Sequence, residues 1–223
     1  MNGHLLAVYV VAVVVAMITP GPDMMFVLAT AVRGGARAGL LATLGVATSE
    51  IVQITAVAAG LAALFTAAPA AFTALRICGA IYLLYLGIQA FRNARRGGFG
   101  GLREVVAARN HERGPDAPDR GGVSGRYAYL RGAATNLVNP KMVTFAVAFL
   151  PQFVDRSLGH VPAQFAVLGV IFIALELLID GAVGLGAGRL AGWLSRRRRA
   201  RQALDVGSGT VMVALAARLA FER

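Results

Sequence analysis

The chain has 223 residues, of which 57% are hydrophobic and only 15% are charged. This composition excludes a soluble domain with a polar surface, because such domains carry about 25% charged residues. Several apolar runs reach the ~20 residues that a helix needs to cross a bilayer, so the sequence predicts one all-α, polytopic membrane domain over residues 1–223.

Cysteine and histidine are too sparse to predict a metal or haem site. Cys78 is the only cysteine, and the three histidines stand at or near predicted ends and loops. With no cluster of these residues, we expect no metal and no other cofactor. The first apolar run has no basic residues before it and no small-residue cleavage site, so we interpret it as a membrane span and not as a secretory signal.

The first span, about residues 5–32, contains the sequence Thr-Pro-Gly-Pro-Asp over residues 19–23. Two prolines remove backbone donors and clash with the preceding turn, which predicts a helix broken at Pro20–Pro22. Asp23 then places a carboxylate at membrane depth, at a cost of roughly 2.5–3.5 kcal/mol. One interpretation is a substrate or ion site at the break, and the other is a kink with an Asp that reaches the interface. The coincidence of break and charge favours the site.

The second span, about residues 38–65, carries Glu50, and the third covers about residues 72–91. A polar stretch from Arg92 to Arg131, rich in Gly, Pro and Arg, predicts a flexible connector over about residues 92–128. Its main expected role is to set the topology.

The fourth span, about residues 129–153, contains Asn136 and the sequence Asn139-Pro140-Lys141, and we expect Pro140 to break it. The fifth, about residues 161–188, holds Glu176 and Asp180 one turn apart on one face. A sixth span covers about residues 203–221.

The net charge of +11 would suggest a nucleic-acid partner in a soluble protein. Here the charge is sorted by loop, so we expect no nucleic-acid partner and interpret the charge as setting the orientation of the six spans. Arginines concentrate in the first, third and fifth connections, over about residues 33–37, 92–131 and 189–201. Positive loops stay in the cytoplasm, so both termini should face the periplasm or the exterior.

The two halves of the chain show an internal repeat. Pro22-Asp23-Met24 in the first span corresponds to Pro140-Lys141-Met142 in the fourth, and Glu50 corresponds to Glu176. A unit of three spans is odd in number, so the second copy must enter the membrane inverted. The sequence therefore predicts two inverted three-helix repeats, about residues 5–91 and 129–221, with a site where they meet.

In this arrangement Asp23 and Lys141 occupy equivalent positions with opposite charge. They could bind the ammonium and the carboxylate of an amino acid, or pair with each other to close a gate, and the two roles can alternate. Asn136 and Asn139 can cap the following half-helix or bind substrate. Four acids are candidates for carrying a coupling proton, unless some of them lie near the interface and are solvated: Asp23, Glu50, Glu176 and Asp180.

Four short motifs resemble the LysE/RhtB family of amino-acid exporters: Pro20-Gly21-Pro22, Gly79-Ala80-Ile81-Tyr82-Leu83, Asn139-Pro140-Lys141 and Pro151-Gln152-Phe153. The similarity covers nearly the whole chain, with the motifs in family order. It implies a bacterial inner-membrane exporter of amino acids or their derivatives, driven by an ion gradient. By this resemblance the functional segments are Pro20 to Asp23 and Asn139 to Lys141.

The function expected from the sequence is a secondary exporter with the proton as coupling ion. An intramembrane enzyme is disfavoured, because no Ser–His pair at membrane depth could supply a nucleophile. The alternative is a cation exporter or channel that uses Asp23, Glu50 and Glu176 as oxygen ligands, although the positive charge of Lys141 argues against it. Substrate and oligomeric state stay open, a homo-oligomer included.

Overall fold

The computed structural model describes residues 3–19, 21–67, 69–98, 123–155 and 158–221, and the regular elements in these ranges are helices. In chain order they are α1 (Gly3–Ile18), α2 (Pro22–Ala67), α3 (Pro69–Arg95), α5 (Gly125–Leu137), α6 (Pro140–Thr144), the π-helical turn η1 (Phe145–Phe149), the 3-10 turn η2 (Leu150–Phe153), α7 (Val161–Arg196) and α8 (Arg198–Phe221).

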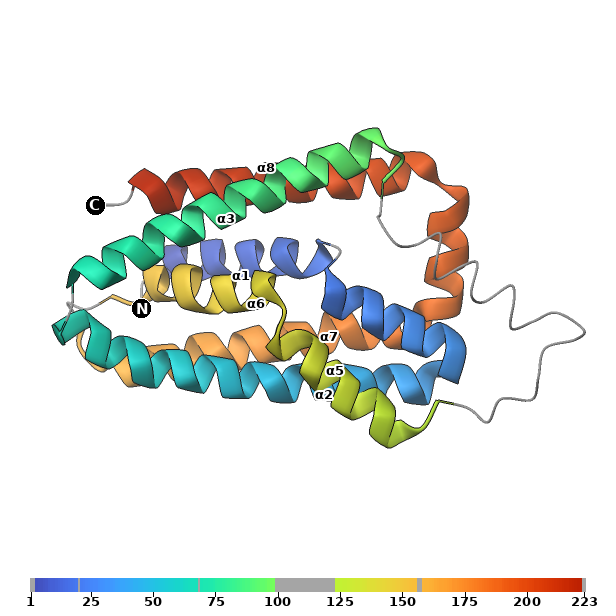
Figure 1. Ribbon diagram of the computed structural model, residues 1–223, viewed down its shortest axis with the longest axis horizontal. Helices are drawn as coiled ribbons and strands as arrows, with labels where there is room; N and C mark the ends of the chain where they lie inside the picture. Colours follow the sequence, from blue (N-terminus) through green and yellow to red (C-terminus); the bar gives the residue numbers. More distant parts are fainter. Residues whose placement is uncertain (1–2, 20, 68, 99–122, 156–157, 222–223) are drawn as a thin grey trace, which may run out of the picture.

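The element α2 joins two spans that the sequence separates. Gly35 interrupts its helical backbone with φ 77°, a left-handed conformation that glycine adopts without strain. Residues 22–34 therefore complete the first predicted span, and residues 36–67 form the second. Figure 1 shows the chain reversing its direction at this point.

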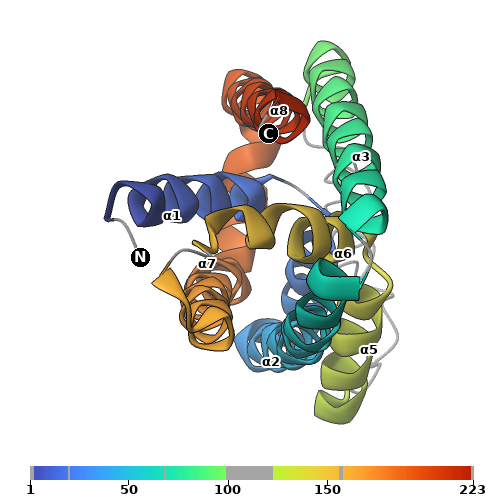
Figure 2. The ribbon, with the colours of Figure 1, turned by 90° about the vertical axis from the view of Figure 1, so that its left-hand side faces the viewer.

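The helices form two outer groups with the broken helices between them. Helices α3 and α8 lie side by side in one group, and α2, α5 and α7 make the other, with α1 and α6 between the two (Figures 1 and 2). Helix α2 packs against both α5 and α7. The approach to α5 is close, because a Cβ at Gly45 would overlap the backbone carbonyl of Tyr129.

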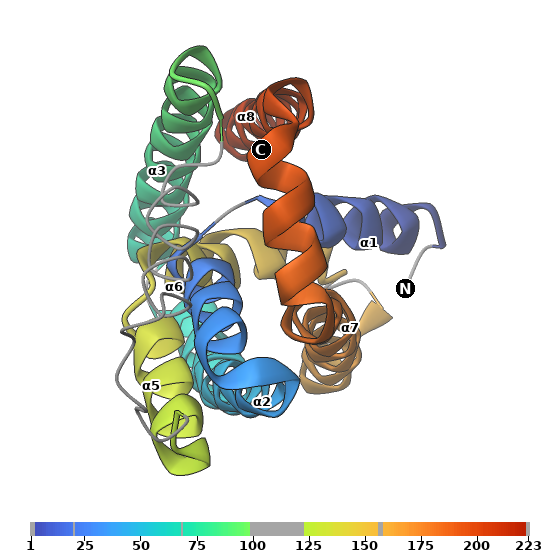
Figure 3. The same ribbon diagram turned by 90° about the vertical axis from the view of Figure 1, so that its right-hand side faces the viewer.

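The two halves run in opposite directions. In Figure 1, α1 runs from the left end of the molecule toward the right, whereas α5 and α6 run from the right end toward the left. Both termini lie at the left end. The Gly35 turn, the end of α3 and the corner between α7 and α8 gather at the right end (Figures 1 and 3). These right-end connections are the arginine-rich ones.

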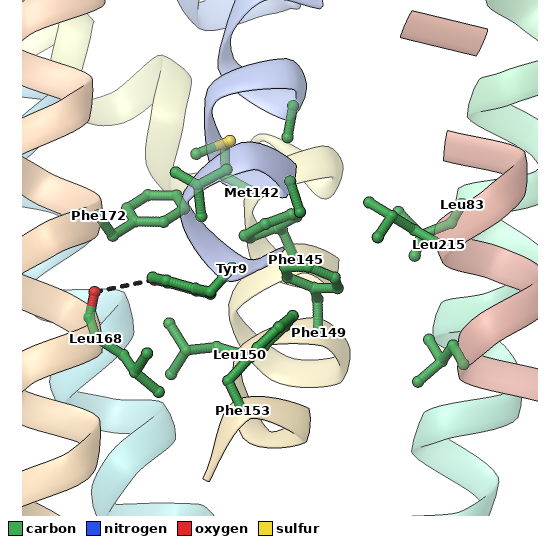
Figure 4. Packing of buried hydrophobic residues seen from close by; sticks show 14 of the residues in the cluster. Tyr9, Leu83, Met142, Phe145, Phe149, Leu150, Phe153, Leu168, Phe172 and Leu215 are labelled. Carbon is green, nitrogen blue, oxygen red and sulfur yellow. Dashed lines mark hydrogen bonds between the residues drawn. The ribbon is translucent and has the colours of Figure 1, made fainter. Parts of the chain in front are cut away.

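An aromatic cluster fills the space beside α1 (Figure 4). Tyr9 of α1 and Phe145, Phe149 and Phe153 of the fourth predicted span are all at most 1% exposed. The Tyr9 hydroxyl donates a hydrogen bond to the Leu168 carbonyl oxygen of α7 at 2.9 Å. The ring centroids of Phe145 and Phe149 are 4.2 Å apart, and those of Tyr9 and Phe153 are 5.0 Å apart. This cluster joins α1, η1, η2 and α7 into one core.

Three helical stretches of the described chain are long and apolar enough to cross a membrane: Pro22–Gly60, Val161–Arg196 and Arg198–Phe221. Helix α1 is shorter because of the break after Ile18. The fifth span was expected to end near residue 188, but α7 continues to Arg196 and α8 begins at Arg198. The basic run therefore lies at a helix corner, where Arg197 stacks on the Trp193 ring at 5.8 Å. The middle of the predicted connector, residues 99–122, lies outside the described residues.

Candidate transport site

The first break separates two helices in the middle of the molecule. Helix α1 ends at Ile18 and α2 begins at Pro22, while Pro20 itself lies outside the described residues. Gly21 is buried and Pro22 is exposed. Pro22 is the first residue of its helix, where a missing N–H costs no hydrogen bond. The break thus leaves α1 with backbone carbonyls that its own helix does not use.

The second break has a different local structure. Helix α5 ends at Leu137, and α6 begins at Pro140 after a cap at Asn139. The Asn139 side-chain oxygen accepts a hydrogen bond from the Lys141 backbone N–H at 3.1 Å. Of the two roles considered for Asn139, capping is therefore the one seen in the structure. After five residues the helix widens into the π-turn η1, a feature that often accompanies functional sites and that the sequence did not predict.

Asp23 and Lys141 meet between the two breaks. The Lys141 Nζ lies 3.9 Å from the Asp23 Oδ1, and the two residues are 5% and 3% exposed. The same ammonium donates hydrogen bonds to the carbonyl oxygens of Ala16 at 3.2 Å and Thr19 at 3.0 Å. Lys141 therefore caps the C-terminal end of α1, where the helix dipole is negative. In this conformation the two charges form the ion pair that was considered as a gate.

Gly21 lies directly against this ion pair. A Cβ built on Gly21 would lie 2.5 Å from the Asp23 Oδ1 and 2.8 Å from the Lys141 Nζ. Such distances are far below van der Waals contact, so any larger residue would have to displace the pair. The glycine of the first break is thus required by the close approach of the two charged groups.

Three further carboxyl groups share this environment. Glu50 of α2 and Glu176 and Asp180 of α7 are each at most 2% exposed, and each interacts electrostatically with Lys141. All three are therefore buried in the protein and are not in the solvated position that was kept as an alternative. Together with Asp23 these residues make four buried acids at the site. Five of the carboxyl oxygens of the four acids have no hydrogen-bond partner among the described residues: Asp23 Oδ1, Glu50 Oε1 and Oε2, Glu176 Oε1 and Asp180 Oδ2.

Asn136 connects α5 to α2 instead of capping α6. Its Nδ2 donates to the Val46 carbonyl oxygen at 3.2 Å and to the Ser49 hydroxyl at 2.8 Å. From α2, the Gln53 Nε2 donates to the Asn136 carbonyl oxygen at 3.0 Å and to the Leu137 carbonyl oxygen at 3.3 Å. Gln53 thus satisfies the carbonyls freed at the second break. Sequence reasoning assigned no role to Ser49 or Gln53. A glutamine one turn from Glu50 in an apolar span could have indicated a buried polar contact at this point.

No group of three or more His, Cys, Asp or Glu side chains in the described chain could hold a metal ion. The Lys141 ammonium occupies the position beside Asp23 where a bound cation would lie, and its positive charge would repel that cation. This arrangement therefore does not support cation export. A cavity of about 480 Å³ lies elsewhere, along α7, and is lined by Ala182, Val183, Gly186, Arg189, Leu190 and Trp193.

Comparison with known proteins places these features in a family. The model of the LysE type translocator matches residues 14–223. An uncharacterized membrane protein of Pseudomonas aeruginosa is 33% identical over 214 residues, which cover 95% of this chain and 93% of the relative. The homoserine/homoserine lactone efflux protein of Salmonella typhimurium is 27% identical over 215 residues, covering 96% of this chain and 95% of that protein.

The counterpart of this efflux protein in Salmonella typhi is also 27% identical over 215 residues. No solved structure matches the chain. The family match covers nearly all of the sequence, including both breaks and the four acids of the candidate site. The chain therefore belongs to the LysE type translocator family and is a multi-pass membrane translocator, not an enzyme.

Proposed function

We propose that this protein is a secondary active exporter of an amino acid or an amino-acid derivative across the bacterial inner membrane, with the proton as coupling ion. The observation that carries the proposal is the buried pair of Asp23 and Lys141 between two helix breaks. Charged side chains are costly in a membrane, so they are retained mainly where a substrate or ion uses them. A broken helix on each side supplies the polar backbone groups that transporter sites use.

The arrangement of the halves supports alternating access. The two broken helices lie in the middle of the molecule and run in opposite directions (Figure 1). We propose that they belong to two inverted repeats of three spans each, with both termini at the outer face because the arginine-rich connections gather at the opposite end. Rocking of one repeat against the other would expose the pair to each side in turn.

The ion pair gives a simple way to bind a zwitterion. The ammonium group of an amino acid can contact Asp23, and the carboxylate can replace Asp23 at Lys141. Each charge of the ligand then compensates one charge of the pair, so the site never holds an isolated charge, which would be strongly unfavourable. The gate and the binding site are two states of the same residues.

The relatives indicate which substrates to test first. A homoserine/homoserine lactone efflux protein is similar to this chain along almost its whole length. We therefore propose homoserine and related small amino acids, together with their derivatives, as the first substrates to examine.

A sensitivity screen in a strain stripped of amino-acid exporters tests this function. We expect the protein to restore growth in the presence of its substrate, and Asp23→Asn and Lys141→Ala to reduce export to the level of the empty vector. The matched control is Asp205→Asn, which alters a buried acid of α8 outside the site. Membrane content must be equal by immunoblot. Normal export by either site variant would contradict the site assignment, and a chain that exports none of these compounds would contradict the function.

A further inference from the structure

Glu50 differs from the other three acids of the transport site because both of its carboxyl oxygens are unpaired in the described structure. Its side chain is 1% exposed, and neither carboxyl oxygen has a hydrogen-bond partner among the described residues. Lys141 is the cation recorded as interacting with Glu50 in the described structure, and its charge is already shared with Asp23. A bare buried carboxylate is strongly unfavourable, so Glu50 must hold either a proton or a cation whenever the site is closed.

Two more polar atoms beside Glu50 also lack partners. The side chain of Asn136, which is fully buried, interacts with Glu50, and its Oδ1 accepts no hydrogen bond from the described chain. The Asp23 Oδ1 is likewise without a hydrogen bond, and Asp23 interacts electrostatically with Glu50. Three side chains therefore supply unpaired acceptor oxygens: the carboxyl groups of Glu50 and Asp23 and the amide group of Asn136. A primary ammonium has three N–H donors, one for each of these groups.

The neighbouring chain fixes Glu50 and Asn136 relative to each other. Ser49, which precedes Glu50, accepts from the Asn136 side chain, and Gln53, which lies one turn later, holds the Asn136 carbonyl. The Asn136 Nδ2 is occupied by these bonds to α2, which leaves only its Oδ1 for a ligand. The Asn136 side chain and the α2 backbone at Glu50 are therefore held together before any ligand arrives, which reduces the ordering that binding requires.

We propose that Glu50 is the exchange point for coupling, where the ammonium group of the substrate displaces the proton of Glu50, and a proton entering from the outside later displaces the substrate. This inference rests on the proposed export function. The exchange is balanced: a protonated Glu50 and a free ammonium ion become a carboxylate–ammonium pair and one released proton. One cycle then exports one substrate and imports one proton.

The same charge balance selects the substrate class. An amine whose carboxyl group is masked as an amide, ester or lactone adds one positive charge, which the ionised Glu50 compensates while the pair of Asp23 and Lys141 stays intact. A free amino acid brings its own carboxylate, which replaces Asp23 at Lys141, so its ammonium is compensated by Asp23 and Glu50 keeps its proton. Of the two substrate classes in the proposed function, the amino-acid derivative with a masked carboxyl group is therefore the one whose export is coupled to a proton through Glu50.

Other ionisable groups around Glu50 do not alter this distinction. Those that face it are Asp23, Lys141 of α6, Asp180 and Glu176 of α7, and Tyr9 of α1. Asp23 and Lys141 are the pair that rearranges between the two ligands, as described above. Asp180, Glu176 and Tyr9 are unchanged in both complexes, so their contributions to a comparison of the two ligands cancel to first order. The difference in the number of protons released by the two ligands therefore measures the effect of masking the carboxyl group.

Calorimetric titration of the purified full-length protein tests the exchange, because measurements in buffers of different ionisation enthalpy give the protons released on binding. The probes are L-homoserine amide and L-homoserine at a pH where the amide is cationic. We expect about one more proton released per bound amide than per bound L-homoserine. In Glu50→Gln this difference should vanish, whereas the control Asp205→Asn should keep it.

Three results would overturn the exchange at Glu50. These are equal proton release by the two ligands, a difference that persists in Glu50→Gln, and a difference that is lost in Glu176→Gln but kept in Glu50→Gln. A wild-type protein that exports amino acids but does not bind the amide would also overturn it, and export itself would stand. If wild type exports none of the compounds screened, the proposed function fails instead.

Discussion

The two helix breaks use the same residue, proline, but they are stabilised in different ways. At the first break, the carbonyls of Ala16 and Thr19 are bound by the charged Lys141 from the opposite half of the chain. At the second, the carbonyls of Asn136 and Leu137 are bound by the neutral Gln53 of α2. A substrate carboxylate can attract the Lys141 ammonium away from the carbonyls of the first break. The Gln53 amide at the second break is neutral, so a charged substrate does not attract it in this way. The first break is therefore the one suited to rearrange during transport.

Exchanging the charges of the ion pair is the strongest test of this comparison. With Asp23→Lys and Lys141→Asp together, a carboxylate would face the carbonyl oxygens at the end of α1 and repel them. We expect no recovery of export and a loss of stability close to the roughly 3–5 kcal/mol of a broken buried pair. Export assays and thermal unfolding of the purified protein would measure both effects. A double variant as stable as wild type would show that the carbonyl contacts are unimportant.

A methyl group at Gly21 should disturb the first break without removing any charge. In Gly21→Ala the new Cβ would overlap both Asp23 and Lys141, so the pair must separate. Forced overpacking typically costs about 1–3 kcal/mol, and we expect export to fall by about tenfold or more because both charges move. The measurement is the initial rate of export at equal membrane content.

The matched control for this substitution is Gly207→Ala in α8, where a Cβ would meet no atom within 4 Å. It should export at the wild-type rate. If both alanine variants export equally well, the pair does not need the space that Gly21 leaves.

Removing the amide at the second break should affect stability more than transport. Gln53→Leu removes one of two donors to the Asn136 carbonyl, which keeps the Asn139 N–H, and the donor to the more exposed Leu137 carbonyl. We therefore expect a cost at the low end of the about 1–3 kcal/mol of an unsatisfied buried group. We expect a lower unfolding temperature with most of the export activity retained. The control is Gln89→Leu, an exposed glutamine of α3, which should unfold near the wild-type temperature. A loss of export as complete as in Lys141→Ala would mean that the two breaks do not differ in function.

The smallest expected effect is at the cap of α6. Asn139→Ala removes the oxygen that accepts from the Lys141 N–H, at a cost of about 0.5–2 kcal/mol. Asn139→Ser restores a capping oxygen and should recover most of the lost stability, as measured by thermal unfolding. An Asn139→Ser variant as unstable as Asn139→Ala would indicate that the asparagine has a role beyond the cap.

Much of the helical fold could be predicted from the sequence, but some boundaries could not. Apolar length located the spans, and the prolines located both breaks to within a residue or two. The continuation of α7 to Arg196 was missed because Arg189 was interpreted as the start of the basic connection, although Ala191 and Leu194 continue the buried face of the helix. The turn at Gly35 was expected as a basic connection of several residues, but the helical backbone is interrupted at Gly35 alone, where the chain reverses its direction.

The candidate site was only partly visible in the sequence. The internal repeat indicated that Asp23 and Lys141 would face each other, and the structure places them 3.9 Å apart. The contacts of Lys141 with Ala16 and Thr19, and of Gln53 with the second break, join residues that are 83 to 125 positions apart in the chain. Such partners depend on how the helices pack, which no local pattern encodes.

By itself, the sequence determined that the chain crosses a membrane, where its helices break, and that an acid follows the first break and a base the second, because these follow from apolar length, proline geometry and the order of the residues. Only the tertiary structure decided which groups satisfy the broken backbone and which carboxyl oxygens are left unpaired. Hydrogen bonds and charge compensation at membrane depth depend on the neighbours that the folded chain brings within about 3–4 Å, and those neighbours come from helices far apart in sequence.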